Sequence, residues 1–129
     1  MAQSGRFSLS VRVLAVLAAK PDSMQTSASI AEDLGASAVM VRRTFLLLQK
    51  AGLIAQRKGP SGGARLLLPP KEIGLGDIFA ATSGPDWIAI DHAKSPALDQ
   101  LLKRTRKDAI ATMNETTLAQ VLKRLAKAE

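Results

Sequence analysis

Residues 53–68 carry the feature that most restricts the fold of this 129-residue chain. Two short runs of strand-forming residues, 53–58 and 64–68, flank a Gly-Pro-Ser-Gly-Gly loop at 59–63. Glycine and proline suit the special backbone angles of a tight connection, so this pattern predicts a two-stranded hairpin. Basic residues stand on both strands, and Pro69 follows the second one. We therefore expect an exposed, cationic hairpin.

Three short helices are predicted before this hairpin. Apolar residues at helical spacing over 7–19 predict the first helix. The second is capped by Thr26 or Ser27 and ends at Gly35, because glycine readily takes the left-handed conformation that closes a helix. Ser37 caps the third. The second and third helices, joined by a glycine-containing turn, have the spacing of a helix-turn-helix. Three helices followed by a hairpin are the order of elements in a winged helix.

Positive charge is concentrated in the first part of the chain. The sequence carries 18 Lys plus Arg against 11 Asp plus Glu. Residues 1–70 hold nine basic and three acidic residues, a net charge of +6, whereas residues 71–129 hold nine basic and eight acidic, a net charge of +1. Such a field favours a polyanionic partner, and both nucleic acid and an anionic membrane surface satisfy it.

Composition narrows these alternatives. The chain has no cysteine, which rules out disulfides and thiolate-held metals, and its single histidine argues against a zinc enzyme. A Ser–His–Asp mechanism would have to use His92. Its aromatic residues are three Phe and one Trp, too few for the base stacking that single-stranded nucleic acids require. No apolar run approaches the ~20 residues of a membrane span, and the run at 13–19 fits an amphipathic helix better than a secretory signal. We therefore expect a cytoplasmic protein that binds double-stranded DNA.

The third helix and the hairpin carry the candidate DNA contacts. In a winged helix the first turns of this helix meet base edges in the major groove, where arginine pairs with guanine, and Gln49 and Lys50 are better placed for phosphate. Basic hairpin residues reach phosphates or the minor groove. The same residues also fit a solvated charged face or a surface that docks an acidic protein partner. The predicted DNA-binding residues are Ser37, Ala38, Val39, Met40, Arg42, Arg43, Lys50, Arg57, Lys58, Gly59, Ser61, Gly62 and Arg65.

The rest of the chain is predicted to be helical around an irregular segment. A short helix is expected over 75–82, a long amphipathic helix from Pro96, and a last helix opened by a capping box of Thr117 and Gln120. The long helix extends beyond a winged-helix core, so its apolar stripe needs a partner, and a second copy is the simplest one. The predicted dimer interface is Leu98, Leu101, Leu102, Thr105, Ala109, Ile110 and Met113.

These expectations give a mainly α fold with one small β-hairpin and three parts. A winged helix-turn-helix DNA-binding domain occupies 1–83, a connecting loop 84–95, and C-terminal dimerisation helices 96–129. The loop contains Trp87, Asp91 and His92. Trp87 is predicted to anchor the long helix to the domain. A lone histidine in a polar loop is commonly a surface residue, so an enzyme that uses His92 is the weakest hypothesis.

The chain resembles the Rrf2 family of bacterial winged-helix regulators. The resemblance is close over about residues 5–84 and looser in the C-terminal helices. The segments that carry it, in order, are Gly5-Arg6-Phe7, Ile30-Ala31-Glu32, Gly35-Ala36-Ser37, Phe45, Leu48, Lys50-Ala51-Gly52-Leu53-Ile54, Arg57-Lys58-Gly59-Pro60-Ser61-Gly62-Gly63, Ile73-Gly74-Leu75-Gly76-Asp77-Ile78 and Thr117-Leu118-Ala119.

The resemblance implies a homodimer, held by the long helix near 96–113, that binds roughly palindromic DNA and usually acts as a repressor. The family reads the major groove at the positions of residues 38, 39, 40, 42 and 43, and many members place a basic residue in the minor groove at the position of Lys58.

The chain also departs from the family pattern. Members that bind an iron–sulfur cluster carry cysteines in the segment that corresponds to about 84–96, and this chain has none. We therefore expect neither such a cofactor nor a thiol sensor. Arg42 and Arg43 stand where the best-known members have Glu and Gln, so a different DNA sequence should be read.

Two further points stay open. Leu46 and Leu47 are apolar where the family has small or basic residues, which implies either extra packing or a different orientation of the third helix. For sensing, the alternatives are a small-molecule pocket near Trp87 and His92, a protein partner, or no effector.

Overall fold

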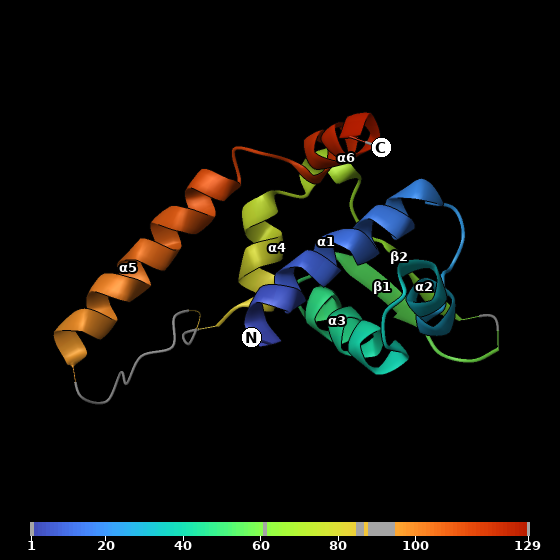
Figure 1. Cartoon of the computed structure of the whole chain (residues 1–129), viewed down its shortest axis with the longest axis horizontal. Coiled ribbons are helices and arrows are strands. Elements are labelled where there is room, and N and C mark those ends of the chain that lie inside the picture. The colour runs from blue at the N-terminus through green and yellow to red at the C-terminus, as the bar shows by residue number, and fades with distance from the viewer. Residues whose placement is uncertain (1, 61, 85–86, 88–94, 129) are drawn as a thin grey trace.

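Helix α1 (Ala2–Ala19) runs through the middle of the molecule, and the winged-helix elements pack around it (Figure 1). The computed structural model describes residues 2–60, 62–84, 87 and 95–128. The fold is mainly α with one β-hairpin, as predicted. The remaining elements, in chain order, are α2 (Ser27–Leu34), α3 (Ala38–Lys50), β1 (Ile54–Arg57), β2 (Gly63–Leu66), the 3-10 helix η1 (Pro70–Glu72), α4 (Leu75–Thr82), α5 (Pro96–Met113) and α6 (Leu118–Ala128).

The apolar side chains of α1 form the centre of the core. Val13, Leu14 and Leu17 are fully buried, which confirms an amphipathic helix at 13–19. Ser10 is buried beside them because its hydroxyl donates to the carbonyl of Arg6 at 2.9 Å, so this serine does not interrupt the buried face. The helix begins at Ala2, earlier than the range 7–19 that periodicity predicted. No helix in the described residues is long and apolar enough to cross a membrane.

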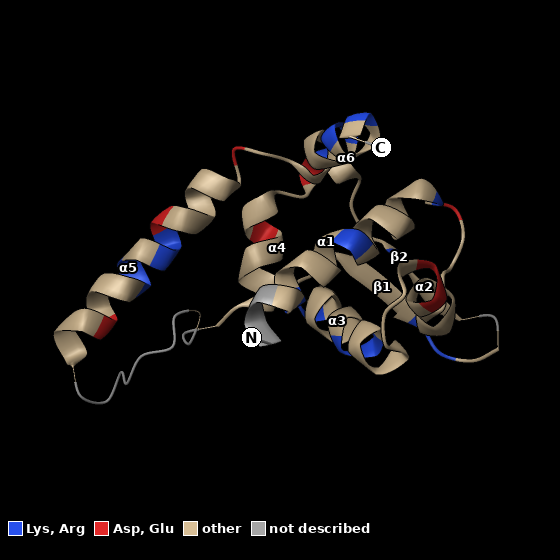
Figure 2. Cartoon of the chain, viewed as in Figure 1, with Lys and Arg blue, Asp and Glu red and all other residues tan. Residues whose placement is uncertain are grey.

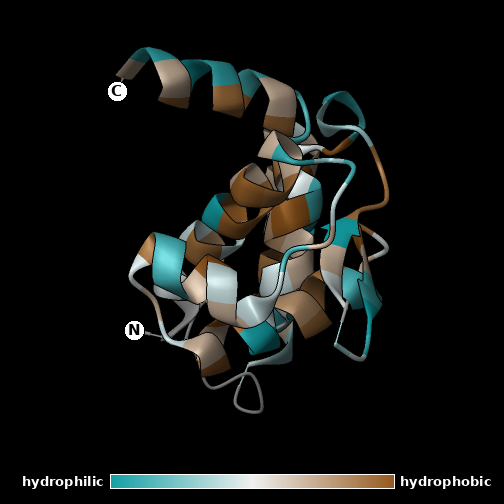
Figure 3. Ribbon diagram, turned by 90° about the vertical axis from the view of Figure 1, so that its right-hand side faces the viewer, coloured by the Kyte–Doolittle hydropathy of each residue, from teal (hydrophilic) through white to brown (hydrophobic). Residues whose placement is uncertain are grey.

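The helix-turn-helix is closed by the caps that the sequence predicted. The Thr26 hydroxyl accepts the N–H of Ser29 at 3.0 Å at the start of α2, and Gly35 ends α2 with a φ of 64°. The Ser37 hydroxyl accepts the N–H of Met40 at 3.4 Å at the start of α3. Apolar side chains of these helices and of the hairpin are buried together with those of α1, namely Ile30, Ala31, Val41, Phe45, Leu48, Ile54 and Ala64. Figure 3 shows hydrophobic residues (brown) concentrated on the central helices.

The hairpin pairs its strands antiparallel, from Ile54 opposite Leu66 to Arg57 opposite Gly63. The strands are shorter than the predicted ranges 53–58 and 64–68. At the inner end Leu53 donates its N–H back to Leu48, which belongs to the last turns of α3, so the first strand begins one residue later. The hairpin is thus joined directly to the end of α3.

Of the two C-terminal helices, α6 packs on the core. The predicted capping box is confirmed: the N–H of Thr117 donates to the Gln120 side chain at 2.9 Å, and the N–H of Gln120 donates to the Thr117 hydroxyl at 3.2 Å. Leu118 is fully buried, and its N–H donates to the carbonyl of Ile73 at 2.7 Å. The start of α6 therefore belongs to the core of the winged helix.

Helix α5 instead extends away from this core and contacts α4 (Figure 1). Although all of α5 lies in the described part of the chain, none of its residues is buried. Arg106 makes the link to α4: its guanidinium donates to the carbonyl of Ser83 at 2.7 Å and lies over the ring of Phe79. A cation that binds carbonyls at the C-terminal end of a helix also interacts favourably with the helix dipole.

Candidate nucleic-acid interface

Helix α3 presents one buried side and one exposed side. Val41, Thr44, Phe45 and Leu48 are buried against the rest of the fold. The opposite side carries residues 39, 43, 46 and 50, which lie in one row because they are spaced by three or four positions. All four side chains in this row are exposed. The row alternates apolar and cationic residues: Val39, Arg43, Leu46 and Lys50.

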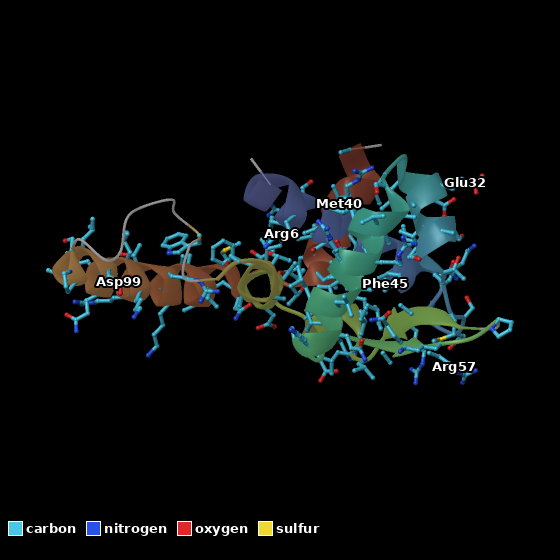
Figure 4. All side chains as sticks on the ribbon, turned by 90° about the horizontal axis from the view of Figure 1, so that it is seen from below. Arg6, Glu32, Met40, Phe45, Arg57 and Asp99 are labelled. Atoms are coloured by element: carbon cyan, nitrogen blue, oxygen red, sulfur yellow. The ribbon has the colours of Figure 1, made fainter. Side chains whose placement is uncertain are left out.

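The hairpin adds a second exposed, cationic face. Ala55 is paired with Arg65, and Arg57 is paired with Gly63. Residues two apart on a strand share a face, and paired residues lie on the same face, so Arg57 and Arg65 project from one side of the hairpin. Both are exposed, and Lys58 is exposed just beyond the first strand. Figure 4 shows Arg57 on the hairpin at the edge of the molecule.

None of these cations is neutralised within the described residues. Figure 2 shows basic residues on α3 and on the hairpin, and neither of these two elements carries an acidic residue. The described side chains of this surface form no ion pair; the ion pair recorded in the structure joins Lys103 and Asp99 on α5. Unpaired cations on one surface attract a polyanion and retain their full charge for it. We call this surface, made of Arg42, Arg43, Lys50, Arg57, Lys58 and Arg65, the basic face.

Hydrogen bonds fix the hairpin relative to α3 and α2. The side-chain amide of Gln56 on β1 donates to the side-chain oxygen of Gln49 on α3 at 2.6 Å. Gln49, which was expected to face phosphate, is thus engaged in holding the two halves of the basic face together. On the far strand, Ala64 exchanges two backbone hydrogen bonds with Gln25, of 2.9 and 2.8 Å, so the chain just before α2 continues the small sheet.

Gly63 makes this second junction possible. Its φ is 138°, which L side chains rarely adopt, and a Cβ at this position would lie 2.5 Å from the backbone oxygen of Gln25. A residue with a side chain would therefore strain the backbone and push the hairpin away from the segment before α2. Glycine here positions the hairpin beside the helix-turn-helix.

A groove that the sequence reasoning missed lies along the basic face. Its volume is about 390 Å³, and Arg6 of α1 lines it together with residues of α3. Figure 4 shows Arg6 and Met40 beside each other, although they come from different helices. Leu46 and Leu47 line the same groove, so they do not add to the packed core. No local pattern marked Arg6, because only the packing of α1 against α3 brings it to this surface.

The remaining predicted DNA-binding residues have different environments. Ser37 caps α3, and Ala38 and Met40 are half-buried. Gly59 is exposed, whereas Gly62 is buried, with its Cβ position directly against the carbonyl of Arg57. Gly62 therefore shapes the loop and offers little surface. Ser61 lies outside the described residues.

Trp87 packs in an aromatic cluster. Its ring lies 5.9 Å from the ring of Phe79 in an edge-to-face arrangement, and Phe79 lies 6.3 Å from Phe7 in the same manner. Arg106 of α5 lies over Phe79, so the cluster joins α1, α4 and α5. This agrees with the predicted role of Trp87 as an anchor. His92 and Asp91 lie outside the described residues, and the predicted effector pocket beside them stays a prediction.

The residues predicted for a dimer interface divide into two sets. Leu98, Leu101 and Thr105 are exposed, with Leu101 at 59% exposure. Ile110 lies toward α4, since its backbone oxygen lies next to the Cβ position of Gly76. The half-buried residues of the predicted interface are Leu102, Ala109, Ile110 and Met113.

Comparisons with known proteins agree with this architecture. A family model described as "Rrf2: Iron-dependent Transcriptional regulator" matches residues 3–124. The chain belongs to the Rrf2 family. A protein of Rhodopseudomonas palustris named BadM, with a provisional assignment as an HTH-type transcriptional regulator, is 31% identical over 112 aligned residues, and the match covers 83% of this chain and 72% of that protein.

Solved structures of Rrf2-type regulators share the fold. The structure of IscR from T. potens has a TM-score of 0.69 and 26% identity, and the match covers 96% of this chain and 88% of that one. CymR from Staphylococcus aureus has a TM-score of 0.66 and 28% identity, with 92% and 95% covered. Like these relatives, the chain is a DNA-binding transcriptional regulator with a winged-helix fold and not an enzyme, in agreement with the sequence-based prediction.

The iron-dependence named in the family description does not fit the residues of this chain. Iron–sulfur clusters are held by cysteine thiolates, in some cases with histidine, and the sequence has no cysteine and one histidine. In the described residues no three His, Asp or Glu side chains are grouped as a metal site would require.

Proposed function

We propose that this Rrf2 regulator acts as a homodimer that binds a roughly palindromic operator in double-stranded DNA and represses transcription without an iron–sulfur cluster. The observation that carries the proposal is the basic face, in which exposed cations of α3 and of the hairpin stand on two elements that carry no acidic residue. Its α3 part suits base edges in the major groove, and its hairpin part suits phosphates or the minor groove.

Arg6 extends this surface. It lines the groove on α3 together with Arg43 and Lys50, so three cations border one channel. A DNA backbone that follows the major-groove edge beside α3 would pass Arg6 and Lys50, and each charge neutralised there adds to the affinity through counterion release. We therefore add Arg6 to the proposed DNA contacts and leave Gly62 out of them.

The dimer is supported by the exposed stripe on α5. Leu98 and Leu101 stand 42% and 59% exposed on a helix that already packs on α4 through a different side. A second copy that covers these side chains would remove them from water, and two-fold symmetry would present two basic faces to one palindromic site. A dimer bound to the operator would repress transcription by occupying that DNA, so repression requires no further binding surface on the protein.

The test is a selection of the purified, metal-free protein against random duplex DNA. An enriched motif with two-fold symmetry is the expected result, and its affinity should fall by on the order of 10³-fold between about 50 and 200 mM salt if about six phosphates are contacted. Visible spectra and iron content of protein purified without oxygen should show no cluster. Absence of DNA binding at low salt would contradict the proposal and favour an acidic protein partner.

The direction of regulation needs a separate measurement. A reporter gene placed behind the selected motif should be expressed less when the protein is present. The double variant Arg42→Ala, Arg43→Ala, which leaves the packed side of α3 intact, should restore expression. Increased expression with the wild-type protein would show an activator instead.

A further inference from the structure

The exposed row of α3 contains two apolar side chains that the general DNA-binding role does not explain. Val39 is 48% exposed and Leu46 is 57% exposed. Single apolar residues on a surface are common, but these two stand seven positions apart in the row that also carries Arg43 and Lys50. The row therefore presents apolar and cationic groups alternately along the side of α3 that faces away from the core.

Major-groove chemistry suggests what such a row recognises. Thymine presents a C5-methyl group there, and guanine presents the O6 and N7 acceptors that pair with arginine. Apolar side chains that contact thymine methyls distinguish thymine from cytosine and from purines without any hydrogen bond. An alternating row of apolar and cationic residues thus has the chemistry to read thymines next to guanines.

We propose that Val39 and Leu46 are specificity-determining residues that bind thymine C5-methyl groups at two different positions of each operator half-site. The inference rests on the proposed function. A second copy of the chain does not suit this surface, because Arg42, Arg43 and Lys50 would meet the same cations of the partner. DNA supplies both the negative backbone that these cations need and the methyl groups that cover the two apolar side chains.

The substitution of deoxyuridine for thymidine tests the idea directly. Deoxyuridine lacks the methyl group and keeps every hydrogen-bonding group of thymidine, so each thymidine of the selected operator is replaced singly. Kd is then measured at one salt concentration for the wild type, Val39→Ala and Leu46→Ala. Both alanine variants should fold, because the side chains are exposed and alanine is a good helix former. Leu125→Ala, at a 42% exposed leucine of α6, is the matched control.

The expected result is a loss of sensitivity specific to each variant. At two positions of each half-site deoxyuridine should weaken wild-type binding by about 4-fold, since burial of one methyl group contributes ~0.8 kcal/mol. Val39→Ala should no longer respond at one of them and Leu46→Ala at the other, whereas Leu125→Ala responds as the wild type does. If only one variant loses its response, the residue changed in the other variant is not a methyl reader.

Three outcomes would overturn the inference: wild-type binding that is indifferent to deoxyuridine, variants that respond as the wild type does, or a change of oligomeric mass in Leu46→Ala. An enriched motif without methyl dependence refutes this inference alone. A selection that enriches no motif refutes the proposed function and this inference with it.

Discussion

Asn114, in the turn after α5, forms two hydrogen bonds with Asp77 in the first turn of α4. Its side-chain oxygen accepts the backbone N–H of Asp77 at 2.9 Å, and its amide donates to the Asp77 carboxylate at 3.3 Å. The other carboxylate oxygen accepts the N–H of Gly74 at 2.9 Å. These contacts satisfy N-terminal N–H groups of α4 and fasten the end of α5 to it.

Asn114→Ala should therefore destabilise the fold. The N–H of Asp77 loses its side-chain acceptor at the start of α4 and keeps the carbonyl of Gly74, at 3.0 Å. Loss of a helix-capping contact costs about 1 kcal/mol. Urea unfolding monitored by circular dichroism measures the change in the free energy of unfolding. Glu115→Ala, at the exposed neighbouring residue, should change it little. Equal midpoints for the two variants would show that the Asn114–Asp77 contact does not stabilise the protein.

Substitutions on α3 and on the hairpin should have different effects on DNA binding, the first on base preference and the second on affinity for any sequence. Arg43→Ala should relax the preference at one position of the motif and cost about 1–3 kcal/mol against the preferred base. Lys58→Ala should weaken binding to all sequences similarly and lower the salt slope by about one. Titrations of the operator and of a scrambled duplex at several salt concentrations separate the two effects. Lys123→Ala, on α6, serves as the control, and identical behaviour of Arg43→Ala and Lys58→Ala would contradict this division.

Leu101→Glu should prevent dimer formation. Burial of a carboxylate in an apolar contact is costly, whereas in the monomer this position is exposed and tolerates a charge. Light scattering should give the mass of one chain, and operator affinity should fall by orders of magnitude because one basic face is lost. Leu125→Glu introduces the same charge at an exposed leucine of α6. A dimeric Leu101→Glu protein would rule out α5 as the interface.

Gly63→Ala should disturb the hairpin through its junction with the chain before α2. The backbone conformation disfavours alanine by about 1–3 kcal/mol, and its Cβ would collide with Gln25. We expect a lower melting temperature. We also expect weaker DNA binding, because displacement of the hairpin moves its cations away from the DNA. Gly59→Ala also meets an unfavourable φ, of 106°, but has open space around its Cβ position, so it should cost less. A larger loss in Gly59→Ala would contradict the role given to the Gln25 junction.

Local sequence signals predicted most elements correctly. The helix caps at Thr26, Ser37 and Thr117, and the glycine that ends α2, act on backbone groups a few residues away. The start of α1 was less predictable, because no capping residue marks it and the apolar repeat begins after it. The first strand was predicted to start one residue too early because the closure of α3 takes the N–H of Leu53.

The candidate site was predictable in its residue types and less so in its geometry. The cations of α3 and the hairpin followed from the motif, and their exposure is confirmed. The pairing of Gln49 with Gln56 was not foreseen, because both residues looked like ordinary surface amides. Leu46 and Leu47 left two interpretations open; Leu46 is exposed, Leu47 is half-buried, and both line the groove.

The order of the elements, their caps and turns, the excess of positive charge and the lack of cysteine ligands could all be read before folding, because they depend on composition and on residues close along the chain. The tertiary structure decided that Arg6 joins the groove on α3, that Asn114 reaches Asp77, and that Leu118 enters the core while Leu101 stays exposed. These contacts join segments that are far apart in the sequence, so they depend on which faces of the helices pack together. That packing is set by burial of the apolar core as a whole.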